Sequence, residues 1–426
     1  MKSPFSRNLA ASVLAQLLRY GAPLAFYPFL TRVLGAEGFA TFALAFAGAV
    51  MLGQLVEFGF GLSGVRALAE ASDQPAAAAE VVGDVIVGRC VTLAVVTVAS
   101  LLCWRWAPTT VRSDMPLAMS VAALAVGYGF SASWYYIGRE RAARLAGLEI
   151  VTSFSQLALL LMFVKTGSPS WLAVALMAVP VWVIVTFGHV VALRDLGAIW
   201  PSWMRLRAKM VESFQFFCFT GIMPILNRAN LLVLGSMSTP AQVAYYAVGE
   251  RIVTAAANAT VPIIRVAMPR ITNLLRDDPA AAQRIFRRSF FGLTGLATVG
   301  AVIGAGLTPW GVPIVFGAAI APGVLVIAIQ LFIVPAIIAT RIIGTMALVP
   351  LRQEGRYQRA VLVSSIGGLC LAPLFIIWAD AAGLAAWRVA VESGAAAYCL
   401  WTLMQRHEGW LKFSRNSEQG ASRHPY

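Results

Sequence analysis

Apolar stretches of about twenty residues recur along the whole chain, separated by short polar links. A helix of about this length spans the roughly 30 Å hydrocarbon core of a bilayer. The mean hydropathy is +0.75 and 12% of the 426 residues are charged, and no polar segment is long enough for a soluble domain. The sequence therefore predicts an all-α polytopic membrane protein.

Twelve candidate spans follow from the hydropathy pattern. They are roughly 9–31, 39–62, 82–104, 116–137, 145–164, 170–192, 211–236, 242–265, 290–312, 322–349, 360–378 and 383–404. The first apolar run has full spanning length, and no small-residue cleavage site interrupts it. We therefore expect a retained first span and not a cleaved signal peptide.

The basic residues are distributed very unevenly over the loops. With twelve spans, one side of the membrane receives both termini and 23 of the 33 lysines and arginines. The other side receives Arg32, Arg105, Arg112 and Lys165, and the remaining six lie inside predicted spans. Because cytoplasmic loops carry the excess of Lys and Arg, we expect both termini in the cytoplasm.

The two halves of the chain resemble each other loosely. Leu34-Gly35 and the following 39–43 have counterparts roughly 200 residues later in Leu234-Gly235 and 243–247. A repeat of six spans gives two halves of the same orientation, related by an axis along the membrane normal. We expect one lobe over residues 1–200 and a second over 201–426, with a cleft between them. Chance similarity among apolar helices is the alternative.

Several arginines lie inside predicted spans, where an exposed guanidinium group at the centre costs about 2.5–3.5 kcal/mol or more. Lining a cleft, such groups would bind a phosphate or diphosphate through forked, charge-assisted hydrogen bonds. The alternative is an ion pair between helices or a bond to helix carbonyls. The candidate substrate-binding residues, including two neighbouring amides, are Arg19, Arg228, Arg251, Arg341, Gln16 and Asn227.

Acidic residues inside the spans are few. Glu57 and Glu250 are candidates for coupling transport to a proton or Na⁺ gradient, and neutralisation of a neighbouring arginine is the alternative. Arg388 and Glu392 are spaced i, i+4 and should pair locally. Arg89 is close to the inner membrane–water interface, so its long side chain can extend there and keep the guanidinium group in water.

Other function classes find no support. The five cysteines and three histidines form no metal-binding pattern, and the charge forms no basic face for nucleic acid. No phosphate-binding loop, nucleophile elbow or zinc-protease motif is present. We therefore expect neither an enzyme nor a cofactor.

Some short motifs resemble those of the oligosaccharide-flippase branch of the MATE-like exporter superfamily. They are Gln16 with 28–39, Gly59-Phe60-Gly61 leading to Arg66, 134–140, and 227–235 with 245–247. The likeness in topology covers the full length, and these motifs cover about a quarter of it. It implies two six-helix bundles that form a V around a central cavity and open alternately to each side.

The resemblance also implies a function. It implies export of polyprenyl-diphosphate-linked oligosaccharide units for a surface polysaccharide, across the bacterial inner membrane. The substrate would carry an undecaprenyl tail, and a polysaccharide polymerase is an expected partner. The alternatives are an ion-coupled multidrug exporter, a membrane glycosyltransferase or ligase, and a scaffold protein without transport.

Overall fold

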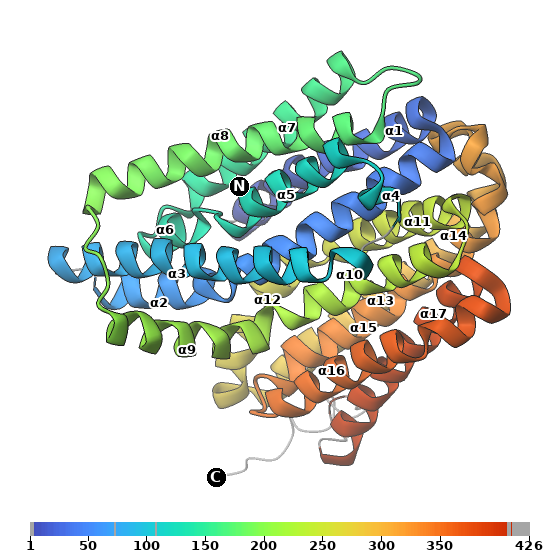
Figure 1. Ribbon diagram of the computed structural model, residues 1–426. Coiled ribbons are helices and arrows are strands. Elements are labelled where there is room, and N and C mark those ends of the chain that lie inside the picture. The colour runs from blue at the N-terminus through green and yellow to red at the C-terminus, as the bar shows by residue number, and fades with distance from the viewer. Residues whose placement is uncertain (1–3, 72–73, 107–108, 407–409, 411–426) are drawn as a thin grey trace, which may run out of the picture.

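A computed structural model of the chain describes residues 4–71, 74–106, 109–406 and 410, with side chains from residue 25 onward except at 106, 109–110, 219–220 and 406. These residues form helices and connecting loops without any strand. Nine helices in the described part are long and apolar enough to cross a membrane, or ten when the bent pair α9–α10 counts as one span. The predicted all-α membrane fold is thus confirmed (Figure 1).

The first half of the chain contains the helices up to α8. Their bounds are α1 Pro4–Glu57, α2 Phe60–Glu70, α3 Pro75–Leu102, η1 Trp104–Trp106, α4 Thr109–Arg112, α5 Met115–Gly129, α6 Ser133–Gly138, α7 Ala142–Phe163 and α8 Ser170–Leu196. The long α1 includes the first predicted span and most of the second, which ends in α2. It bends at Gly35, where φ is 69° and the backbone leaves the helical region.

The second half contains the remaining helices. Their bounds are α9 Trp203–Thr220, α10 Ile222–Met237, α11 Pro240–Asn258, α12 Val261–Asp277, α13 Pro279–Phe316, η2 Ala318–Gly323, α14 Val324–Leu331, α15 Ile333–Ile343, η3 Gly344–Leu348, α16 Glu354–Cys370 and α17 Ala372–Arg406. Breaks divide the predicted spans 211–236, 242–265 and 322–349. Pro224 and Pro262 each lie in the first turn after such a break, where a missing N–H costs no helical hydrogen bond.

Every predicted span falls on helix, and some of the nine or ten candidate crossings of the described residues are continuous stretches that hold parts of two predicted spans. The segment 25–70 of α1 and α2 is one such stretch, and α1 bends within it at Gly35, between the first and second predicted spans. The predicted span 360–378 runs from α16 into the first part of α17, which bends at Ala379 and Asp380. Hydropathy locates the apolar segments, whereas the bends between them decide how many helices are counted.

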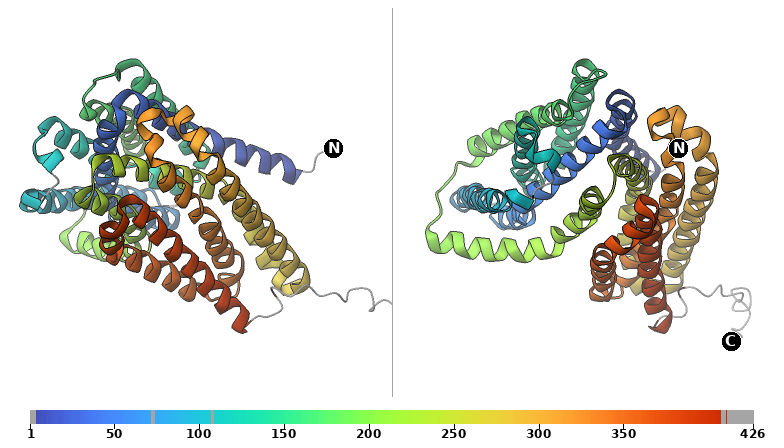
Figure 2. Two further views of the ribbon diagram at one scale, coloured as in Figure 1. Left: turned by 90° about the vertical axis from the view of Figure 1, so that its right-hand side faces the viewer. Right: turned by 45° about the vertical axis from the view of Figure 1, so that its right-hand side comes forward.

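The two halves meet at one end of the bundle, which we call the closed end. Residues of α1 there share one hydrophobic core with the second half, including Tyr27 and Phe42 from α1 and Leu234 and Tyr246 from α10 and α11. Arg32 also donates a hydrogen bond to the carbonyl of Ile314 at the end of α13. Toward the other end the core separates into two clusters, one in each half. The halves therefore diverge away from the closed end (Figure 2).

Helix α9 belongs to the second half of the sequence but packs on the first. Arg205 binds Glu80 at 3.1 Å and Asp84 at 2.8 Å on α3, and Ser213 shares a 2.7 Å hydrogen bond with Ser63 on α2. A Cβ atom on Gly59, whose φ is 80°, would overlap the Ser213 carbonyl oxygen. After α9 the chain bends by 59° into α10, which packs with the second half (Figure 2).

The outer surface is apolar over much of its area. Along α13, side chains such as Leu296 (69% exposed) and Ile314 (70% exposed) face outward. A soluble protein rarely exposes an apolar surface of this extent. The exposed face of α13 is therefore suited to contact with lipid tails.

Candidate functional site

A polar cavity with a volume of about 850 Å³ lies in the described part of the chain. Helices α1, α2 and α5–α8 supply most of its walls, and the second half contributes Arg228 from α10 and Arg251 from α11. This volume lies within the range of cavities that hold small ligands. The structure thus brings two of the predicted arginines together on the inner wall of one cavity.

Arg228 and Arg251 lie against aromatic rings of α1. The guanidinium carbon of Arg228 is 5.7 Å from the centre of the Phe46 ring, and that of Arg251 is 5.0 Å from the centre of the Tyr27 ring. Such cation–π contacts orient a guanidinium group without using its N–H donors. Among the described side chains, neither arginine forms a hydrogen bond or an ion pair, and the Nε atom of Arg251 is buried without an acceptor. Their donors remain available to an anion in the cavity.

Helix α7 contributes a polar stripe to the wall of the same cavity. Glu149, Thr152, Ser153 and Gln156 are spaced i, i+3, i+4 and i+7, and all four line the cavity. Gln156 donates to the Met177 carbonyl at 2.9 Å. Hydropathy and in-span charge do not single out this stripe, although the helical spacing of four polar residues within an apolar span indicates it.

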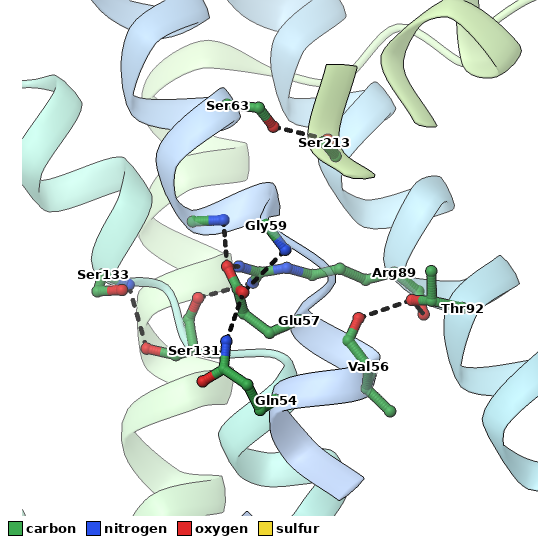
Figure 3. Close-up of polar contacts among 11 residues, drawn as sticks. Gln54, Val56, Glu57, Gly59, Ser63, Arg89, Thr92, Ser131, Ser133 and Ser213 are labelled. Carbon is green, nitrogen blue, oxygen red and sulfur yellow. Dashed lines mark hydrogen bonds and ion pairs between the residues drawn. The ribbon is translucent and has the colours of Figure 1, made fainter. Parts of the chain in front are cut away.

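Glu57 lies at the break between α1 and α2, and its carboxylate accepts several hydrogen bonds (Figure 3). It accepts hydrogen bonds from Gln54 at 3.1 Å, from the backbone N–H of Gly59 at 2.9 Å and from that of Gly61. Arg89 on α3 lies 3.9 Å away and forms an ion pair with it. These contacts support the alternative of a neutralising role for Glu57, and its role in ion coupling stays a prediction.

Arg89 is buried, contrary to the expectation that it reaches the interface. Its side chain is 0% exposed and donates to the Ser131 carbonyl at 2.7 Å (Figure 3). Ser131 lies in the break between α5 and α6, where the chain leaves a carbonyl without a helical partner. Because hydropathy locates a residue only along the membrane normal, it could not show that the Arg89 side chain faces the protein interior.

A second, smaller cavity of about 290 Å³ lies within the second half of the chain. Asn227 and Glu250 line it, although they directly precede Arg228 and Arg251 in sequence. Neighbouring residues on a helix point about 100° apart. Each of α10 and α11 therefore presents one residue of its pair to the central cavity and the other to the second cavity. The two helices form the wall between the cavities.

Arg341 also faces the second cavity and not the central one. It donates a hydrogen bond to the carbonyl of Ala257 at 2.9 Å. For Arg341 this contact agrees with the alternative interpretation, in which an arginine inside a span bonds to a helix carbonyl. Arg388 and Glu392 line the same cavity and are 3.1 Å apart, as their spacing predicts. The positive charges of Arg228, Arg388 and Arg251 all act on the Glu250 carboxylate.

Two further predicted residues, Gln16 and Arg19, lie on α1 before residue 25, outside the described side chains. Their proposed contacts with substrate stay predictions.

Solved transporter structures share this architecture. A multidrug transporter of the MATE family, in an inward-facing conformation, matches with a TM-score of 0.71 and 13% identity over 92% of this chain and 94% of its own. The lipid II flippase MurJ, in an inward closed conformation, matches with a TM-score of 0.68 and 11% identity over 89% and 87%. At this level of identity the likeness establishes the fold, which is MATE-like.

Comparison of sequences assigns the chain to a family, which is a narrower assignment than the fold. A protein of Escherichia coli (strain K12) named for O-antigen transport is 25% identical over 301 residues, covering 70% of this chain and 72% of its own. Residues 5–275 match the family model described as polysaccharide biosynthesis protein. With well over half of its length matched by that model, the chain belongs to the polysaccharide biosynthesis protein family.

Proposed function

We propose that the protein is a flippase that moves polyprenyl-diphosphate-linked oligosaccharide units across the membrane for the assembly of a surface polysaccharide. The observation that carries this proposal is the pair Arg228 and Arg251, whose donors face the central cavity without a partner among the described side chains. Arginine binds phosphate groups through paired hydrogen bonds. The relative named for O-antigen transport supports the same class of substrate.

The cavity suits the two ends of such a substrate differently. The diphosphate would bind at the two arginines, and the sugars would lie along the polar wall of the first half. The undecaprenyl tail would stay in lipid between the two lobes, which we place at residues 1–200 and 201–426, with α9 of the second segment packed against the first lobe. A polysaccharide polymerase is the expected partner on the receiving side.

The closed end gives the direction of opening. If both termini are cytoplasmic, as the loop charges predict, the closed end lies on the outer side and the cavity opens inward. The inward-facing conformation of the similar transporter supports this orientation. The structure would then represent the state that accepts substrate from the cytoplasmic leaflet of the bacterial inner membrane, and rocking of the lobes would expose it to the other side.

A reconstituted transport assay tests this proposal. Proteoliposomes with undecaprenyl-diphosphoryl-N-acetylglucosamine in one leaflet should move it to the other leaflet much faster than protein-free vesicles. A cationic dye of the kind exported by multidrug transporters should not be transported. Transport of the dye without the lipid-linked sugar would favour the multidrug exporter instead.

We further propose that Glu250 couples transport to an ion gradient. Its carboxylate lies in a small polar cavity beside the wall that also carries Arg228 and Arg251, so its protonation would alter the field at the substrate site. In the same vesicles, a proton or Na⁺ gradient should accelerate flipping by the wild type, and Glu250→Gln should remove that acceleration. Glu354→Gln, an exposed residue at the start of α16, is the matched control and should retain it. An unchanged gradient response in Glu250→Gln would exclude Glu250 from coupling.

A further inference from the structure

A tyrosine of the first half lines the central cavity together with the two arginines of the second half. This residue is Tyr128, near the end of α5, and it is half-buried. Its ring stands edge-on to the ring of Phe46, with the two centres 6.4 Å apart and the planes at 85°. Since Arg228 lies over the same Phe46 ring, this phenylalanine contacts both the tyrosine and the arginine.

The Tyr128 hydroxyl lies within the field of both guanidinium groups. The positive charges of Arg228 and Arg251 each act on the Tyr128 phenol. Because the interaction with a charge weakens with distance, a group that feels both arginines lies in the region that they share. Polar groups from both halves of the chain therefore converge on one part of the cavity.

Gln156 on α7 is placed to orient this hydroxyl. Its side-chain amide is in hydrogen-bonding contact with the Tyr128 hydroxyl. One N–H of the amide donates to the Met177 carbonyl at 2.9 Å, which fixes the amide in position. The amide has a second N–H to donate, and a hydroxyl that accepts it keeps its own O–H for another partner. The Tyr128 O–H can then be directed away from α7.

Close packing of α5 against α1 fixes the position of Tyr128. A Cβ atom on Gly53 of α1 would lie 2.8 Å from the Cβ atom of Tyr128 and 2.9 Å from the Ala125 carbonyl oxygen. A Cβ atom on Gly129 would lie 2.5 Å from Cγ1 of Val56. The two glycines permit this close approach because they have no side chain. A donor held in place in this way loses little freedom when a ligand binds.

We propose that Tyr128 is the ligand that the first half of the chain provides for the diphosphate. Its hydroxyl, oriented by Gln156, donates a hydrogen bond to the anion that the two arginines hold. This inference rests on the proposed function. A hydrogen bond from a hydroxyl to an anion is charge-assisted and about twice as strong as one between neutral groups. The bound diphosphate then contacts both halves and links them in this conformation.

Replacing Tyr128 with phenylalanine tests the proposal, because the change removes the hydroxyl and keeps the ring against Phe46. The measurement is binding of undecaprenyl diphosphate to the purified protein in nanodiscs. Tyr128→Phe should weaken binding about tenfold or more, as expected for one hydrogen bond to a charged group, at an unchanged unfolding temperature. Tyr398→Phe, the same change at an exposed residue of α17, is the matched control and should bind like the wild type.

A second replacement tests the orienting role of Gln156. Gln156→Leu leaves the Tyr128 hydroxyl without its donor from α7 and should weaken binding of the same lipid severalfold. Because Gln156 acts through the hydroxyl, its replacement should have little further effect in the Tyr128→Phe background.

The outcomes separate this inference from the proposed function. Wild-type affinity in Tyr128→Phe would overturn the inference and leave the proposed function standing. Weaker binding with a lowered unfolding temperature would also overturn it, since the residue would then have a structural role. Full additivity of the two replacements would show that Gln156 does not act through Tyr128, and would overturn the inference as stated. If the wild type failed to bind undecaprenyl diphosphate, the proposed function would fall together with this inference.

Discussion

Replacing both Arg228 and Arg251 with alanine should abolish flipping and the surface polysaccharide that depends on it. The variant would lose the charge-assisted hydrogen bonds that each guanidinium group makes to a bound diphosphate, and each such bond contributes about 1.5–3 kcal/mol. With one such bond lost at each arginine, affinity should fall about two to four orders of magnitude. The measurements are flipping in proteoliposomes and surface polysaccharide in cells, each at a matched level of inserted protein.

Two control variants separate charge from position. Arg66→Ala removes an exposed arginine that pairs with Glu70 outside the cavity, and it should leave transport intact. Replacement of Arg228 and Arg251 with lysine keeps both charges but loses the forked donor geometry, so it should restore transport only in part. Normal polysaccharide in the double alanine variant would remove these two residues from the substrate site.

Arg19→Ala is predicted to abolish polysaccharide as well.

Replacing Glu57 with glutamine should destabilise the protein by about 3–5 kcal/mol. The change leaves the buried guanidinium group of Arg89 without its counter-charge, and an uncompensated buried charge is costly. The glutamine amide also keeps fewer acceptor sites for the N–H groups of Gly59 and Gly61 at the start of α2. The measurement is thermal unfolding in detergent or nanodiscs.

A second change provides the internal control. Arg89→Met in the Glu57→Gln background removes the unpaired charge and should recover a large part of the lost stability. Glu70→Gln breaks the exposed ion pair with Arg66 and should cost less than about 1 kcal/mol. If Glu57→Gln were as stable as Glu70→Gln, the ion pair with Arg89 would have no structural importance.

Much of the fold could be predicted from hydropathy. Each predicted span falls on helix because burial in lipid requires about twenty apolar residues wherever the chain crosses. The number of helices was less predictable. The bend at Gly35, the break at Gly221 and the bend at Asp380 depend on backbone conformation, which hydropathy does not report.

The candidate site could be predicted only in part. Charge inside an apolar span indicated Arg228 and Arg251, and both line the central cavity. The same reasoning could not show that Asn227 and Arg341 face a second cavity. It also placed Arg89 at the interface, because depth along a helix does not reveal which side of the helix faces protein.

The sequence by itself determined that this chain is a helical membrane protein and where its apolar segments lie. It also determined that these segments contain arginines, whose charge is energetically costly to place in lipid. These properties are local, since each depends on about twenty consecutive residues and the cost of moving them into lipid. Only the tertiary structure decided that α10 and α11 present Arg228 and Arg251 to one cavity and Asn227 and Glu250 to another. The packing of α1 against α10 and α11 orients those helices about their axes, and that rotation decides which residues can share a ligand.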